Sequence, residues 1–216
     1  MPLQASSNDI TIKTEKVLTY LALGDSYTIG ESVPQSGSFP YQLQSLLKDK
    51  KVTVAEPKII ATTGWTTDEL MQAIQHARLT SKFDFVTLLI GVNNQYRGYP
   101  IATYKKEFLA LLQTAISFAK GNKKHVFVIS IPDWGKTAFG VSGGRNLDDV
   151  AREIDHFNII CKEITLAEGV NYTDITPISR RGLVEPDLVA SDGLHPSVKM
   201  YGEWVKLLVP KVIGSV

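Results

Sequence analysis

Short apolar runs alternate with segments of helical periodicity along this chain, and that alternation restricts its fold more than any other feature. Buried strands are expected at residues 17–24, within 52–61, and at 83–90, 125–131 and 170–175. Amphipathic helices are expected at residues 39–50, 67–79, 101–120, 148–168 and 197–209. Strands that alternate with helices build a parallel sheet that is covered by helices on both faces. The sequence therefore predicts an α/β fold.

Length and composition limit the classes of protein to which the chain can belong. Its 216 residues contain no linker, repeat or low-complexity tract, so residues 1–216 are expected to form a single domain. The 23 basic and 22 acidic residues leave a net charge of +1, which gives no basic surface for nucleic acid. No apolar run approaches the ~20 residues of a membrane span. The single cysteine excludes an intrachain disulfide and a CxxC zinc site.

The N-terminal segment 1–16 is polar and is expected to be loosely ordered. It contains no apolar stretch of the kind found in export signals, which favours a cytoplasmic protein. Removal of a leader peptide would leave the same sequence, so a cytoplasmic protein and an exported one both stay open.

The loops at the carboxyl ends of the strands are where an open parallel sheet binds its ligands. Ser26 follows the first expected strand, within the segment Gly24-Asp25-Ser26-Tyr27-Thr28. A serine at that place can be presented as a nucleophile at the edge of the sheet. The alternative is a turn or a helix cap, since aspartate and serine favour both.

Two further loops carry candidate hydrogen-bond donors. Gly64 follows the second strand and precedes a helix, so its backbone N–H can point toward a reacting carbonyl oxygen. Asn93 follows the third strand, and its side-chain amide can donate to the same oxygen. For both residues a local role in a turn is the alternative.

A candidate acid and base precede the last expected helix. Asp192 can orient the imidazole of His195, which leaves the other ring nitrogen free to accept a proton from a serine. The remaining histidines, His76, His125 and His156, lie in expected helices or at the start of a strand and are typical of surface positions.

Together these segments resemble the SGNH branch of the GDSL-type serine esterases and lipases. The four blocks are LGDSY at 23–27, the glycine in TTGWTT at 62–67, GVNN at 91–94 and SDGLHPS at 191–197. The resemblance implies a flavodoxin-like three-layer α/β/α sandwich with a central, mostly parallel sheet of about five strands.

The resemblance also implies roles for individual residues. Ser26 is the nucleophile, His195 the general base and Asp192 the acid that orients it. The backbone N–H groups of Ser26 and Gly64 and the side chain of Asn93 form the oxyanion hole. The expected substrate is a small acyl ester, an acetylated carbohydrate or a lysophospholipid. Such acyl transfer through a serine needs no metal ion and no organic cofactor.

Two residues depart from the pattern of this family. Tyr27 stands where the family name has leucine, which is expected to affect packing or the pocket wall rather than the chemistry. Asn94 stands where the third block has aspartate, so an amide must support this loop in place of a carboxylate.

A second serine motif competes with the first. Residues 140–144 read GVSGG and match the GxSxG nucleophile elbow of α/β-hydrolases. That motif requires a strand directly before it, whereas here the strand ends near residue 131 and residues 132–139 intervene. Ser142 is therefore not expected to be the nucleophile.

Substrate binding is expected to fall to residues that flank these loops, namely Tyr27, Trp65, Tyr96, Arg97 and Trp134. The aromatic rings suit an acyl chain or a sugar. The arginine can bind a carboxylate or phosphate on the substrate, or pair with a nearby acid. Residues 133–147 contain four glycines and are expected to form a mobile lid over the site.

Two other functions fit parts of the pattern. A metal-dependent phosphoesterase also uses Gly-Asp and Asn-rich segments at strand ends, although this chain lacks the several histidines of a two-metal site. A non-catalytic carbohydrate-binding module would use the aromatic residues, but it leaves the arrangement of Ser26, Asp192 and His195 without a purpose. Sensitivity to EDTA distinguishes the first alternative, and reaction of Ser26 with a fluorophosphonate distinguishes the second.

Overall fold

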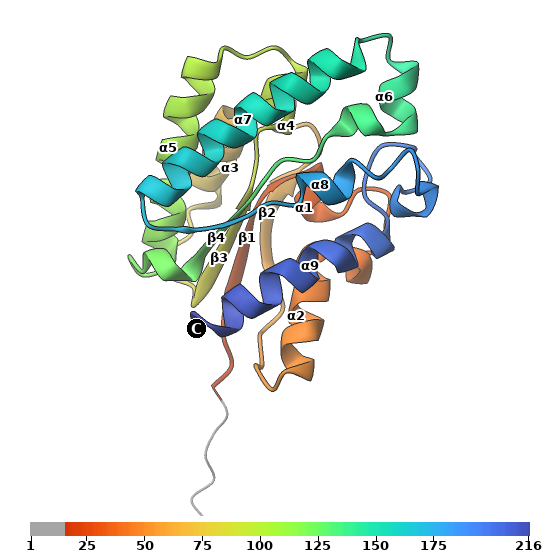
Figure 1. Ribbon diagram of the computed structural model, residues 1–216. Coiled ribbons are helices and arrows are strands. Elements are labelled where there is room, and N and C mark those ends of the chain that lie inside the picture. The colour runs from red at the N-terminus through yellow and green to blue at the C-terminus, as the bar shows by residue number, and fades with distance from the viewer. Residues whose placement is uncertain (1–15) are drawn as a thin grey trace, which may run out of the picture.

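The computed structural model describes residues 16–216, so nearly all of the polar segment predicted at 1–16 lies outside the described residues. The described chain forms three layers, with a central sheet between two layers of helices (Figure 1). The strands are β1 (Tyr20–Asp25), β2 (Lys58–Thr62), β3 (Phe85–Leu89), β4 (Val126–Ile129) and β5 (Asn171–Thr173). They pair in the order β2-β1-β3-β4-β5, and every pair is parallel. This arrangement confirms the predicted flavodoxin-like sandwich.

The central strands form the apolar centre of the molecule. Every residue of β1, β3 and β4 is buried, as their continuous apolar runs predict. Aromatic side chains of neighbouring strands also stack on each other, with 4.4 Å between the ring centroids of Tyr20 and Phe85. The edge strand β2 occupies the end of the expected segment 52–61 and extends one residue beyond it to Thr62. It begins after Pro57, whose nitrogen cannot donate a ladder hydrogen bond.

Amphipathic helices cover both faces of the sheet. The helices α2 (Phe39–Asp49) and α9 (Val198–Ile213) pack against each other on one face. The other face is covered by α3 (Thr67–Ala77), α5 (Ile101–Phe118) and α7 (Leu147–Ala167) (Figure 1). Side chains cap the first turns: Thr66 and Glu69 form a capping box in α3, and the Ser197 hydroxyl accepts a backbone N–H of α9.

Short helices occupy several of the loops. They are α1 (Ser26–Ile29), α4 (Val92–Tyr96), α6 (Ala138–Ser142), α8 (Thr176–Ser179) and the 3-10 turns η1 (Gln35–Gly37), η2 (Lys123–His125), η3 (Trp134–Lys136) and η4 (Pro186–Leu188). None of the helices in the described chain is long and apolar enough to cross a membrane.

The register of the sheet brings three loops together. Asp25 at the end of β1 pairs with Thr62 at the end of β2, and Gly24 pairs with Leu89 at the end of β3. Because the strands are parallel, their carboxyl ends meet at one edge. The loops that follow β1, β2 and β3 therefore start side by side, as the fold class predicts.

The segment 133–147, for which a mobile lid over the site is expected, contains folded elements. It forms η3 and α6, and Trp134 within it is only 3% exposed. A Cβ on Gly140 would lie 2.6 Å from the carbonyl oxygen of Trp134 and 2.7 Å from the Cα of Gly135. Glycine at this position allows two backbones to pack closely, so the glycine content of the segment does not require mobility.

We expect the substitution Gly140→Ala to lower the free energy of unfolding by about 1–3 kcal/mol, because the new methyl group meets backbone atoms that cannot rotate away. Calorimetry would record this loss as a fall in Tm of several degrees. Gly143→Ala is the matched control, since the nearest atom to its added Cβ is 3.4 Å away. An unchanged Tm for Gly140→Ala would instead indicate a segment with room to adjust, as in a mobile lid.

Candidate active site

Ser26 directly follows the interior strand β1 and occupies the first position of α1. The side chain of Asp25 caps this helix and accepts the backbone N–H of Tyr27 at 3.0 Å. Ser26 is 3% exposed, and its Oγ lies 3.0 Å from Nε2 of His195. The strand and the cap thus hold this hydroxyl toward the imidazole.

His195 connects Ser26 to Asp192. Its Nδ1 lies 2.6 Å from Oδ2 of Asp192, while its Nε2 faces the serine. When Nδ1 carries the proton toward the carboxylate, Nε2 has the free electron pair and accepts the hydrogen bond from Ser26. Three side chains from distant parts of the sequence therefore form one continuous hydrogen-bonded chain.

Asp192 is held as an ionised carboxylate. Partial burial opposes its ionisation, but hydrogen bonds from His195, Ser32 and the Leu194 backbone keep the pKa of Asp192 well below its usual value. Ser32 donates at 2.7 Å and has a φ of +64°, a left-handed conformation that serine rarely adopts. No sequence motif predicted this contact, which supports Asp192 at the cost of local backbone strain.

The loop that carries His195 is itself closed by backbone hydrogen bonds. An isolated antiparallel bridge joins Val189 to Pro196, and the Ala190 N–H donates to the His195 carbonyl at 2.8 Å. Gly193 turns the chain with a φ of +72°. These contacts fix the imidazole relative to the sheet edge.

Gly64 lies in a tight turn after β2. The Trp65 N–H donates to the Thr62 carbonyl, and Gly64 has the φ of +84° that a type II turn requires. The Gly64 N–H makes no hydrogen bond with any residue of the described chain. Its carbonyl accepts from Nη2 of Arg97 at 2.5 Å, which holds the turn from outside. The turn therefore leaves one N–H available to a ligand.

Asn93 lies in the first turn of α4. Its Nδ2 donates to the Trp65 carbonyl at 3.0 Å and makes a longer contact of 3.3 Å with Oδ2 of Asp25. Complete burial raises the pKa of Asp25 to about 7, although hydrogen bonds from Tyr27 and Asn93 oppose this shift. The amide is thus tied to the two neighbouring loops, with one N–H only loosely engaged.

Asn94 joins α4 to the start of α3 without the carboxylate that the family pattern has. Its buried Oδ1 accepts the Thr67 N–H at 3.1 Å, and its Nδ2 donates to the Thr67 hydroxyl at 2.7 Å. That hydroxyl donates in turn to Glu107 at 2.5 Å. An ionised carboxylate could only accept, whereas the amide accepts and donates, so it pairs with both polar groups of the threonine.

A pocket of about 150 Å³ opens beside Ser26 and His195. Its polar lining also includes Thr63, Gly64 and Asn93. The hydroxyl, the imidazole and the candidate oxyanion donors therefore face one cavity. Such a cavity can receive a carbonyl group between a nucleophile and hydrogen-bond donors.

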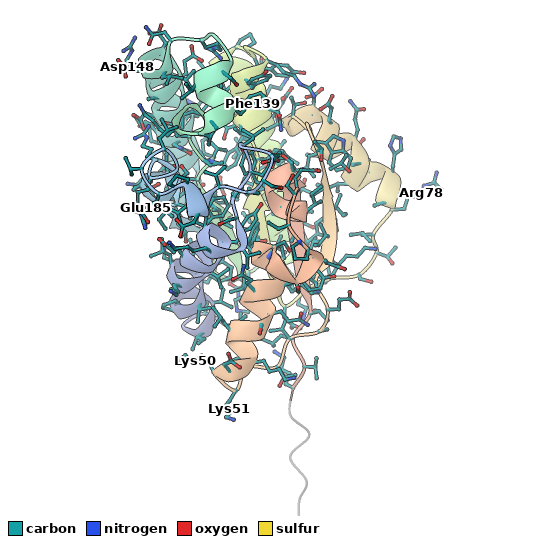
Figure 2. The ribbon with its side chains drawn as sticks, turned by 90° about the vertical axis from the view of Figure 1, so that its right-hand side faces the viewer. Lys50, Lys51, Arg78, Phe139, Asp148 and Glu185 are labelled. Carbon is teal, nitrogen blue, oxygen red and sulfur yellow. The ribbon has the colours of Figure 1, made fainter. Side chains whose placement is uncertain are left out.

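The rest of the pocket wall is apolar. It is formed by Tyr27, Val92, Tyr96, Trp134, Phe139 and Leu194. The ring of Tyr27 also packs against the imidazole of His195, with 5.1 Å between the ring centroids. Phe139 lies in α6, at the end of the molecule opposite Lys50 and Lys51 (Figure 2). Apolar walls of this kind suit the hydrocarbon part of an ester.

Three of the residues predicted to bind substrate line this pocket, namely Tyr27, Tyr96 and Trp134. Trp65 and Arg97 are not among its lining residues. Trp65 packs against the hydrophobic core, and Arg97 pairs with Glu69 at 3.0 Å. The sequence placed both beside the right loops but did not define the direction of their side chains.

Sequence reasoning missed four lining residues, namely Thr63, Val92, Phe139 and Leu194. Three of them adjoin Gly64, Asn93 and His195 in the chain, so adjacency to a predicted site residue was an available signal. The signal for Phe139 was less direct, because it lies within 133–147, the segment that was expected to cover the site.

The competing serine and the other histidines lie outside the pocket lining. Ser142 ends α6, and its hydroxyl donates to a carbonyl of the same helix at 2.9 Å. His76 and His156 are exposed on helices, and the ring of His125 contacts the Ser215 carbonyl. Within residues 16–216, no group of three or more His, Cys, Asp or Glu side chains is placed to hold a metal ion.

Solved structures share this architecture. TesA has a TM-score of 0.71 and 18% identity, over 92% of this chain and 99% of that chain. The lipase/acylhydrolase from Enterococcus faecalis has a TM-score of 0.71 and 20% identity, over 92% of this chain and 96% of that chain. The acetylxylan esterase Axe2 from Geobacillus stearothermophilus has a TM-score of 0.67 and 20% identity, over 90% of this chain and 94% of that chain. At such identities the similarities show the fold alone.

The sequence carries a family signature over most of its length. No curated protein sequence matches this chain significantly. The model of the GDSL-like lipase/acylhydrolase family matches residues 22–202, a range that includes all four blocks and the whole hydrogen-bonded chain from Ser26 to Asp192. This chain therefore belongs to the GDSL-like lipase/acylhydrolase family and is an esterase or lipase of the serine type.

Proposed function

We propose that this enzyme hydrolyses short-chain carboxylic esters through a covalent acyl-enzyme on Ser26. The observation that carries the proposal is the hydrogen-bonded chain from Ser26 through His195 to Asp192, which ends at a small, mostly apolar pocket. A serine activated in this way attacks ester carbonyls, and the pocket places the acyl group beside it.

The first step forms the acyl-enzyme. Oγ of Ser26 attacks the ester carbonyl carbon while its proton moves to Nε2 of His195. Asp192, with its lowered pKa, stays ionised and stabilises the imidazolium through Nδ1. The tetrahedral intermediate collapses, the C–O bond to the alcohol breaks, and the alcohol leaves with the proton from Nε2.

The oxyanion of the tetrahedral intermediate needs donors at the same edge of the sheet. The free N–H of Gly64, the N–H of Ser26 at the start of α1 and the amide of Asn93 supply them. Asn93 can turn its loosely engaged N–H from Asp25 to the oxyanion while the Trp65 carbonyl keeps the amide in place.

The second step releases the acid. A water molecule gives a proton to Nε2 of His195 and attacks the acyl carbonyl carbon. The bond from that carbon to Oγ then breaks, and Ser26 recovers its proton from the imidazolium. The products are the carboxylic acid and the free enzyme.

The size of the pocket favours short acyl groups. A protein cavity of about 150 Å³ holds a benzene molecule, which corresponds to an acyl chain of about six carbon atoms or fewer. An acetylated carbohydrate therefore fits better than a lysophospholipid. The related fold of Axe2, which is an acetylxylan esterase, supports the same class of substrate.

We expect Ser26→Ala to lower kcat/KM for p-nitrophenyl acetate by about 10³-fold or more, because the Ser26 hydroxyl is the one that faces the general base His195. Ser142→Ala is the matched control and should retain wild-type turnover, since its hydroxyl only bonds within α6. Addition of EDTA should leave the wild-type rate unchanged.

Other outcomes of these assays would contradict the mechanism. Full activity in Ser26→Ala would exclude this serine as the nucleophile. Loss of activity in EDTA would favour a metal-dependent phosphoesterase. Labelling of the wild type by a fluorophosphonate, but not of Ser26→Ala, would support the acyl-enzyme independently of any chosen ester.

The raised pKa of Asp25 gives a pH-dependent stability. Below about pH 7 the carboxyl group stays protonated in the folded protein, whereas in the unfolded chain it ionises near pH 3.8. Ionisation therefore favours the unfolded state increasingly as the pH rises from about 4 to 7. Asparagine at this position cannot ionise. We therefore expect the free energy of unfolding of Asp25→Asn, relative to that of wild type, to increase by about 2–3 kcal/mol when the pH is raised from 5 to 8.

Urea unfolding of both proteins at pH 5 and at pH 8 measures this change. Groups that titrate in both proteins contribute equally to their pH dependence, so these contributions cancel in the comparison. Asp49→Asn, at an exposed carboxyl on α2, is the control and should show no such gain. Parallel pH dependence of wild type and Asp25→Asn would mean that Asp25 is ionised in the folded protein well below pH 7.

A further inference from the structure

Trp134 contacts both of the other aromatic rings that lie on its side of the pocket wall. Tyr96 lies edge-on to its indole with 5.1 Å between the ring centroids, and Phe139 does so at 6.1 Å. Because Trp134 is nearly fully buried, its indole N–H needs an acceptor within the protein. Oε1 of Gln95 supplies this acceptor at 2.7 Å. The position of the wall thus depends on a glutamine that is not among the lining residues.

Glu153 fixes the orientation of Gln95. The indole N–H can only donate and an ionised carboxylate can only accept, so the amide must turn its oxygen to Trp134 and its nitrogen to Glu153. Nε2 of Gln95 donates to Oε2 of Glu153 at 2.6 Å. Gln95 is only 2% exposed, so solvent cannot readily replace either partner.

Arg145 contacts both Glu153 and the indole of Trp134. Its Nη2 donates to both carboxylate oxygens of Glu153 at 2.9 Å, and its Cζ lies 5.8 Å from the centroid of the Trp134 ring. Partial burial opposes ionisation of Glu153, but the hydrogen bonds from Gln95 and Arg145 lower its pKa. We call these four side chains, Trp134, Gln95, Glu153 and Arg145, the tryptophan clasp.

The clasp joins elements that are far apart in the sequence. Gln95 lies in α4, Trp134 in η3 and Glu153 in α7. Since α4 also carries Asn93, the pocket wall is tied to the helix that supplies a candidate oxyanion donor. The indole is held both at its N–H and over its ring, so it cannot move aside for a longer acyl chain without leaving a buried donor unpaired.

We propose that Gln95, Glu153 and Arg145 are positioning residues that set the acyl-chain length the enzyme accepts, by fixing Trp134 as a wall of the pocket. This inference rests on the proposed function of the same site. Release of the clasp allows the indole to shift and the pocket to lengthen. Variants without it should therefore accept longer acyl groups.

The test compares kcat/KM for p-nitrophenyl acetate, butyrate, hexanoate and octanoate. In Gln95→Leu, which removes the acceptor at similar volume, the ratio of octanoate to acetate should rise by about tenfold, mainly through a lower KM for octanoate. Glu153→Ala opens the clasp at a side chain that is already 43% exposed, so it should fold and raise the same ratio by a smaller factor. Gln113→Leu, at an exposed glutamine on α5, is the matched control and should leave the ratio unchanged.

A general loss of structure would lower all four rates together and would not change their ratios. Ratios within twofold of wild type in folded Gln95→Leu and Glu153→Ala would overturn the proposal. So would a rise of equal size in Gln113→Leu, because it would show that the effect does not depend on the clasp.

A binding measurement separates this inference from the proposed function. Octanoate and acetate, as product acids, can be titrated into Ser26→Ala and into the double variant Ser26→Ala/Gln95→Leu, with tryptophan fluorescence as the signal. The double variant should bind octanoate about tenfold more tightly relative to acetate. If no ester is cleaved but this selectivity changes, the proposed reaction fails and the clasp stands; an unchanged selectivity overturns the clasp even if the esterase activity is found.

Discussion

A single buried carboxyl group, that of Asp25, links the parts of the active-site edge. One of its oxygens accepts the Tyr27 N–H and so sets the first turn of α1, which carries Ser26. The other oxygen contacts the amide of Asn93 at 3.3 Å. The candidate nucleophile and the candidate oxyanion donor thus take their positions from the same side chain. A carboxyl group buried in this way is unfavourable by itself, and its hydrogen bonds offset part of that cost.

The surrounding loops accept local strain to complete the site. Ser32 adopts a left-handed conformation and places its hydroxyl on Asp192, whereas Gly64 and Gly91 have positive φ values that glycine adopts without strain. Such conformations persist where the rest of the structure over-determines them. Here the parallel sheet and its buried strands provide that rigid framework around Ser32.

Most of the fold could be predicted from local patterns, and the candidate site only in part. The strands and long helices follow from runs and periodicities that lie within one segment, so errors were limited to their ends, as in β5, which spans Asn171–Thr173 within the expected 170–175. The glycines of 133–147 did not distinguish close packing from movement, because Gly140 packs against the backbone of Trp134 and Gly135. The directions of the Trp65 and Arg97 side chains could not be predicted either, because they depend on what each side chain packs against.

Local sequence patterns were enough to predict the succession of strands and helices, the polar blocks at the ends of the strands, and the family to which the chain belongs. These properties depend on residue types within short segments, which can be interpreted without knowledge of three-dimensional contacts. Three-dimensional packing was needed to reveal that Ser32 supports Asp192, that Asn94 pairs with Thr67, and how the residues of the tryptophan clasp contact one another. Those contacts join residues from distant segments, and their distances exist only once the sheet and its helices have packed.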